Sequence, residues 1–88
     1  MKLIVISQNV CSGCRVLESF LKNEFEDVEF EYINIDNNLE AIDEYGVMST
    51  PTTILWDTED NEESMRHVGF SFEKGSDEII ADFIEQLV

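Results

Sequence analysis

The 88-residue sequence has very few cysteines, prolines, histidines and basic residues. It contains two cysteines, one proline and one histidine, and its 20 aspartates and glutamates face only 5 lysines and arginines. A zinc site needs four nitrogen or sulfur ligands, so the small number of Cys and His side chains argues against one. The net charge of −15 repels phosphate backbones and anionic lipid, which argues against nucleic-acid and membrane partners.

Long apolar runs are also missing. The N-terminal run from Leu3 to Ile6 is far shorter than the roughly 7–15 residues of a secretory signal, and no segment has the length of a membrane span. We therefore expect a cytoplasmic protein, in which a close cysteine pair is catalytic or metal-binding. The hydrophobic content of 43% is sufficient for one small globular core, so we expect a single domain over residues 1–88.

The two cysteines form the most informative motif. Cys11 and Cys14 are separated by Ser12 and Gly13, between the apolar run and a helical pattern. This spacing lets both sulfur atoms meet within one helical turn, so we expect Cys11 to attack a substrate disulfide and Cys14 to resolve the mixed disulfide. A helix that begins at the pair favours the thiolate of Cys11 through its free N–H groups and its dipole. Arg15 is the next residue and would add to this electrostatic effect.

Hydrophobic periodicity predicts four strands and three helices. The expected strands are 2–7, 28–35, 52–56 and 64–70, and the expected helices run from the cysteine pair to about residue 25, over 39–45 and over 77–87. We expect Asn37 or Asn38 to cap the second helix, Gly46 to end it, and Ser76 to cap the third. The second half of strand 28–35 is predicted to be buried on both faces.

This order of elements defines a fold class. A strand, helix and strand in succession imply a parallel pair, and the later hairpin adds antiparallel strands. The sequence therefore predicts an α/β protein of the order βαβ-α-ββα, with a mixed four-stranded sheet flanked by helices.

Beyond the cysteine pair, further segments resemble the thioredoxin family. They are 34–38, Ala41, 45–47, 49–52, 54–56 and 67–70. A CxxC motif followed by Thr50-Pro51-Thr52 is much more specific than a CxxC motif alone. The similarity extends over nearly the whole chain and implies a minimal thioredoxin-like fold.

The resemblance also implies roles for individual residues. Pro51 would be the family's cis-proline and face the disulfide, and the backbone of Thr50 would pair with an extended substrate segment. Ser12, Gly13 and Gly69 would complete the substrate-binding surface. The resemblance implies no cofactor and no metal.

The chain departs from the usual thioredoxin pattern at several positions. Thioredoxins usually have tryptophan before the first cysteine and Gly-Pro between the two, where this chain has Val10 and Ser12-Gly13. Glycine gives the reduced turn more freedom than proline would, so we expect a more oxidising couple. Val5 replaces the family's buried aspartate and Tyr32 replaces its lysine partner. Cys14 then lacks the usual internal base, so we expect water or a substrate group to accept its proton.

Three functions remain open from the sequence. The first, which we expect, is a monomeric dithiol reductase of protein disulfides, recharged by a thioredoxin-reductase-type flavoenzyme. The second is a glutaredoxin-like enzyme that uses glutathione, or a redoxin that serves ribonucleotide reductase, which the Gly69-Phe70 pair resembles. The third is an interaction module on a thioredoxin scaffold, and the acidic composition is its support.

Overall fold

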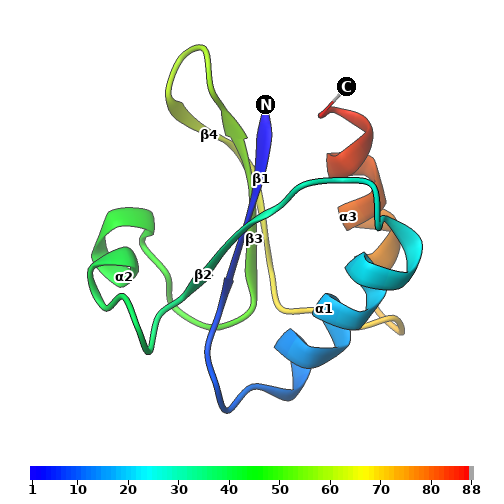
Figure 1. Ribbon diagram of the computed structural model, residues 1–88, viewed down its shortest axis with the longest axis horizontal. Helices are drawn as coiled ribbons and strands as arrows, with labels where there is room; N and C mark the ends of the chain where they lie inside the picture. The colour runs from blue at the N-terminus through cyan, green and yellow to red at the C-terminus, as the bar shows by residue number, and fades with distance from the viewer. Residues whose placement is uncertain (88) are drawn as a thin grey trace.

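The sheet is built around its first strand. In this computed structural model, which describes residues 1–87, the sheet order is β2-β1-β3-β4, with β2 parallel to β1 and the other pairs antiparallel. The elements are β1 (Lys2–Ser7), α1 (Ser12–Glu24), β2 (Glu31–Asn34), α2 (Glu40–Tyr45), β3 (Thr52–Asp57), β4 (Glu62–Val68) and α3 (Ser76–Glu85), as Figure 1 shows. The predicted α/β class and mixed four-stranded sheet are confirmed.

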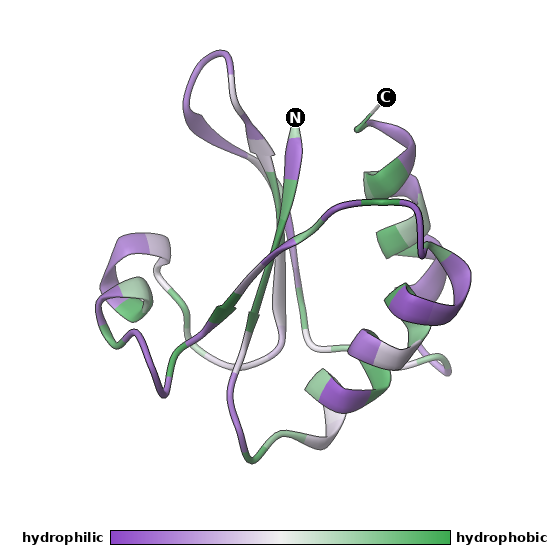
Figure 2. Cartoon of the chain, viewed as in Figure 1, coloured by the Kyte–Doolittle hydropathy of each residue, from purple (hydrophilic) through white to green (hydrophobic). Residues whose placement is uncertain are grey.

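Alternating side chains of β1 divide the core into two layers. Leu3 and Val5 pack on the side of α1 and α3, whereas Ile4 and Ile6 pack on the side of α2 (Figure 1). Figure 2 shows this hydrophobic strand in the middle of the fold and hydrophilic residues in the outer turns. The continuous apolar run therefore became a strand buried on both faces, as predicted. No helix of residues 1–87 has the length and apolar character needed to cross a membrane.

Strand β2 is shorter and more exposed than the sequence predicted. The prediction covered Val28–Ile35, but the strand spans Glu31–Asn34, and Tyr32 is 44% exposed. Burial of its second half on both faces is wrong, because Ile33 and Ile35 pack only partly against the α2 side of the core. The reason is the sheet order: β2 is an edge strand whose one neighbour is β1.

The start of helix α2 also differs from the prediction. The helix begins after Leu39, which makes no side-chain capping bond, so neither Asn37 nor Asn38 is its N-cap. Its end is as predicted: Gly46 has the left-handed φ of 60° that favours glycine, and its N–H donates to the carbonyl oxygen of Ile42.

Ser76 is the first residue of α3, and Gly75 is the N-cap, so the predicted cap is wrong by one position. The Ser76 hydroxyl instead accepts the N–H of Ser71 at 2.9 Å and lies 2.9 Å from Nε2 of His67 on β4. Burial lowers the pKa of His67. The hydroxyl therefore joins α3 to the sheet instead of capping its own helix.

The hairpin of β3 and β4 is tighter than expected. The return strand was predicted over 64–70, whereas β4 begins at Glu62 and ends at Val68. Asn61 closes the turn with a φ of 55°, and the pairing register shifts between Leu55 and Trp56. Residues beyond Val68, including Gly69, consequently leave the sheet and are free to approach the site.

Candidate redox site

The cysteine pair lies in the turn between β1 and α1, at the lower edge of the view in Figure 1. Cys11 is the N-cap of α1 with extended backbone, and its Sγ accepts the N–H of Cys14 at 3.1 Å. The two residues form a disulfide with an Sγ–Sγ distance of 2.14 Å. The helix thus begins at the pair, as predicted. One N–H of its first turn therefore points at the Cys11 sulfur, where such a group stabilises a thiolate.

The two sulfur atoms differ in accessibility. Cys14 is only 2% exposed, whereas Cys11 is partly exposed and follows Val10, which is 90% exposed. The sequence predicted Cys11 as the more exposed cysteine, and this difference is confirmed. Cys11 is therefore the cysteine of the pair that is nearer to solvent.

The loop before β3 supplies the second wall of the site. The Thr50–Pro51 bond is cis, as the family resemblance implied. Pro51 lies against the cysteine turn, because a Cβ added to Gly13 would come within 3.2 Å of its Cδ atom. A residue with a side chain at position 13 would therefore displace one of these two segments.

The segment after β4 supplies the third wall. Gly69 has a φ of 83°, in the region that favours glycine, and its N–H donates to the carbonyl oxygen of Pro51 at 2.7 Å. The carbonyl oxygen of Phe70 lies 3.9 Å from the position of a Cβ on Gly13. The structure therefore brings together three of the predicted site residues from distant parts of the sequence.

A shallow depression of about 510 Å³ opens over the disulfide. It is lined by Gln8, Val10, Cys11, Ser12, Gly13, Met48, Ser49 and Thr50. The Thr50 hydroxyl donates to Oε1 of Gln8 at 2.6 Å, which fixes the two loops relative to each other. Met48 is 96% exposed and is, with Val10, an apolar residue of the lining of the depression. Sequence reasoning missed Gln8 and Met48, and the only signal for Met48 was an apolar residue in a polar loop.

Arg15 contacts the loop before the cysteines. Its guanidinium donates to the carbonyl oxygen of Asn9 at 3.1 Å. The Asn9 N–H donates to Asp36 at 2.6 Å, and the Asn9 side chain accepts from Asn34 at 2.8 Å. These bonds tie the loop to α1 and to the end of β2. Arg15 therefore has a defined role in holding the turn, and its electrostatic effect on Cys11 stays a prediction.

Val5 and Tyr32, which replace the family's aspartate and lysine, lie next to each other. Val5 is buried and pairs with Tyr32 in the parallel register of β1 and β2. Burial raises the pKa of Tyr32, and the negative charge of Glu18 on α1 raises it further. The carboxylate that acts on Tyr32 in this way belongs to the helix and not to the strand.

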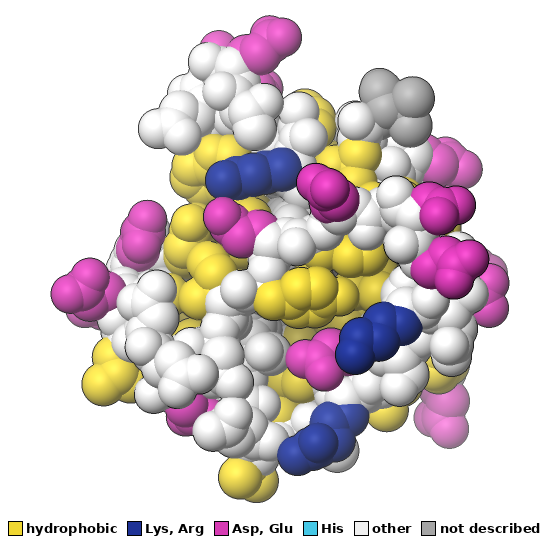
Figure 3. Space-filling model, in the orientation of Figure 1, with side chains coloured by type: hydrophobic (Ala, Val, Ile, Leu, Met, Phe, Trp, Pro, Cys, Tyr) yellow, Lys and Arg dark blue, Asp and Glu magenta, His cyan; other side chains and the backbone are white. Residues whose placement is uncertain are grey.

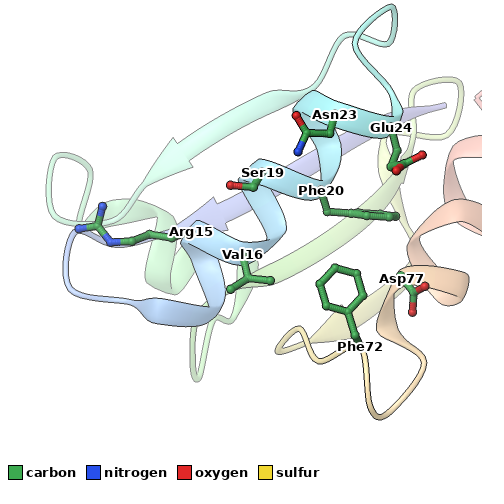
Figure 4. A pocket seen from close by; sticks show the side chains of 8 residues that line it. All are labelled: Arg15, Val16, Ser19, Phe20, Asn23, Glu24, Phe72 and Asp77. Atoms are coloured by element: carbon green, nitrogen blue, oxygen red, sulfur yellow. The ribbon is translucent and has the colours of Figure 1, made fainter.

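A larger groove of about 740 Å³ runs along the outer side of α1. Figure 4 shows its lining side chains, which are Arg15, Val16, Ser19, Phe20, Asn23, Glu24, Phe72 and Asp77. The rings of Phe20 and Phe72 meet edge to face with centroids 5.9 Å apart. Neither cysteine lines this groove, so it lies outside the candidate redox site. Residues 1–87 gather no group of three or more metal-binding side chains.

A disulfide at a helix N-terminus, with one accessible and one buried sulfur, defines a protein of thiol–disulfide redox chemistry. Comparison with known proteins identifies its family. A family described as a thioredoxin domain matches residues 1–71. The SPbeta prophage-derived thioredoxin-like protein YosR of Bacillus subtilis (strain 168) is 34% identical over 70 residues, which cover 80% of this chain and 84% of that protein. The chain belongs to the thioredoxin family.

Solved structures agree with this assignment. Thioredoxin 1 from Thermosipho africanus TCF52B has a TM-score of 0.67 and 25% identity, covering 99% of this chain and 93% of its own. The thioredoxin of Plasmodium falciparum has a TM-score of 0.76 at 14% identity, covering 99% of this chain and 85% of its own, and shows a likeness of fold alone. The predicted thioredoxin-like fold is confirmed.

Proposed function

We propose that this protein is a dithiol reductase of protein disulfides. The observation that carries the proposal is the pairing of a partly exposed Cys11, whose Sγ accepts a helix N–H, with a Cys14 that is almost fully buried. One sulfur is accessible to a protein partner, and the other is held within bonding distance of the first.

In the first step, the Cys11 thiolate attacks one sulfur of a substrate disulfide. A Cys11–substrate disulfide forms, the substrate disulfide breaks, and the departing substrate thiolate takes a proton from solvent. The N-terminal N–H groups of α1 stabilise the attacking thiolate before this step.

In the second step, Cys14 loses its proton and attacks the Cys11 sulfur. The Cys11–Cys14 disulfide forms, and the second substrate thiolate is released. Two electrons have then passed from the protein to the substrate. A thioredoxin-reductase-type flavoenzyme would return the protein to its dithiol form, and we propose that it acts as a monomer in the cytoplasm.

The surface around Cys11 supports a protein substrate. Val10 and Met48 are apolar residues of the lining of the depression, and the backbone of Thr50 would pair with an extended segment that carries the substrate disulfide. Ser12, Gly13 and Gly69 would complete this surface. Figure 3 shows acidic side chains over much of one face and few basic ones, so we expect substrates with a basic patch to bind best.

The test is a reduction assay on a protein disulfide with two regeneration systems in parallel. One contains NADPH and thioredoxin reductase, and the other contains glutathione and glutathione reductase. We expect turnover with the first system, and turnover with glutathione alone would favour the glutaredoxin-like alternative. Failure with both, together with full biological activity of the Cys11→Ser/Cys14→Ser variant, would favour a scaffold role. Equilibration with glutathione tests the more oxidising couple that Gly13 predicts.

A further inference from the structure

A second cavity lies between α1 and the neighbouring ends of β1 and β2. It has a volume of about 310 Å³ and is lined by Ser7, Glu18, Lys22, Tyr32 and Asn34. All five side chains are polar or carry a polar tip, and Ser7 is buried. Such a space, with several hydrogen-bonding partners, is suited to hold ordered water.

Cys14 and Glu18 are neighbours on α1. Residues four apart on a helix lie on the same face with about 5–6 Å between their Cβ atoms. Cys14 is buried on this face, and Glu18 is half-buried and lines the cavity. The helix therefore holds a carboxylate one turn beyond the thiol that must lose a proton.

Val5, which stands where thioredoxins have a buried aspartate, is close by. Val5 pairs with Tyr32, and Tyr32 shares the cavity with Glu18. Glu18 is the only carboxylate among the residues that line this space. We propose that Glu18 accepts, through water in this cavity, the proton that Cys14 loses when it resolves the mixed disulfide. This inference rests on the proposed function and names the proton acceptor for its second step.

The step balances without another reactant. The S–H bond of Cys14 breaks, and its proton passes to water, while a proton of that water passes to the Glu18 carboxylate. The electron pair left on Cys14 forms the bond to the Cys11 sulfur, and the Cys11–substrate bond breaks. Glu18 then returns the proton to solvent after the substrate has left.

The groups around Glu18 in the cavity come from three elements. From α1, Lys22 lines the cavity with Glu18, and Arg15 is held one turn away by the Asn9 carbonyl. From β2 come the hydroxyl of Tyr32 and the amide of Asn34, and β1 contributes the hydroxyl of Ser7, none of which is charged near neutral pH. The raised pKa of Tyr32, caused first by burial and then by Glu18, indicates that the carboxylate charge is felt inside this space.

A single-turnover reaction separates the two steps. The reduced full-length protein is mixed with dithiobis-nitrobenzoate, which releases one coloured thiolate on attack by Cys11 and a second on resolution by Cys14. We expect Glu18→Gln to slow the second release about 100-fold, the lower end of the scale of general base catalysis, and to leave the first release unchanged. The second-release rate of Glu18→Gln should rise with pH over a range in which the wild-type rate is already constant.

Two controls make the test specific. Glu24→Gln changes an exposed carboxylate of the same helix and should behave as wild type. Glu18→Asp should recover part of the rate, and added acetate should accelerate the second release of Glu18→Gln alone. An unchanged second release in Glu18→Gln, or equal slowing by Glu24→Gln, would overturn the role of Glu18. Absence of the first release in the wild-type protein would instead overturn the proposed function.

Discussion

Cys11 and Cys14 share one disulfide, yet the molecule surrounds them differently. Cys11 lies on the open side of the turn, beside the exposed Val10, and its sulfur accepts an N–H of α1. Cys14 lies on the closed side, one turn before the buried Leu17 and almost out of contact with solvent. Two identical side chains only three positions apart are thus given different chemistry by burial and by the start of a helix.

The comparison shows why the helix must begin where it does. At the N-cap, Cys11 receives the donors that the first turn of α1 cannot use within the helix. The N–H of Cys14 is the donor that reaches the Cys11 sulfur, and the sulfur of Cys14 lies inside the buried first turn. The attacking and resolving roles follow from these positions.

Removal of either sulfur should give the largest effect. We expect Cys11→Ser to lower disulfide reduction by about 10³-fold or more, because the attacking thiolate is lost. Cys14→Ser should also fail to turn over, but it should accumulate a mixed disulfide with substrate. Activity assays with non-reducing gels distinguish the two outcomes. Equal amounts of mixed disulfide in both variants would contradict the different roles proposed for Cys11 and Cys14.

Alkylation of the reduced protein measures the difference without substitution. At neutral pH and limiting iodoacetamide, Cys11 should react about tenfold faster than Cys14, because it is more accessible and its thiolate is stabilised. Peptide mass spectrometry gives the ratio directly. In urea the two alkylation rates should become similar. Equal alkylation rates of Cys11 and Cys14 in the native protein would contradict the account.

The packing of the open side against Pro51 can be broken at Gly13. A Cβ at position 13 would lie only 3.2 Å from Cδ of Pro51, so Gly13→Val should overpack this contact and lower the free energy of unfolding by about 1–3 kcal/mol. Urea unfolding measures this, and Ser12→Val provides the matched control because Ser12 is exposed. Equal free energies of unfolding of the two variants would mean that the close approach of Gly13 to Pro51 does not affect stability.

The smallest expected effect is on the stability of the protein at alkaline pH and concerns Tyr32. The pKa of Tyr32 is raised above its usual 10.0 in the folded protein, mainly by burial. As pH rises past that value, the unfolded chain loses this proton first, so the stability present below it declines. Tyr32→Phe should weaken this alkaline decline, which unfolding measurements at several alkaline pH values would detect. An identical decline in both proteins would show that Tyr32 is not perturbed.

Local patterns predicted much of this molecule. The apolar run of β1, the helix that begins at Cys11 and the end of α2 at Gly46 depend mainly on nearby residues, and all three are confirmed. The errors arise from distant contacts. Ser76 was predicted to cap its helix, but its hydroxyl instead lies at hydrogen-bond distance from His67 on β4. The exposure of β2 depends on its place at the edge of the sheet.

The site shows the same division. The cysteine motif was evident from spacing, and the cis bond at Pro51 was expected only through family resemblance. Gln8 and Met48 were missed because their position near Cys11 depends on how two loops meet. The cavity beside Glu18 is formed by residues of α1, β1 and β2 that are distant in the sequence, so no local pattern encodes it.

The most direct test of the account is to identify which sulfur bonds to a substrate. Reduced Cys14→Ser and Cys11→Ser proteins are each incubated with a disulfide-containing protein, quenched with acid, digested and analysed by mass spectrometry. The account predicts an intermolecular disulfide through Cys11 in the first variant and almost none through Cys14 in the second. Comparable adducts through Cys14 would contradict the assignment of attack to Cys11 and resolution to Cys14.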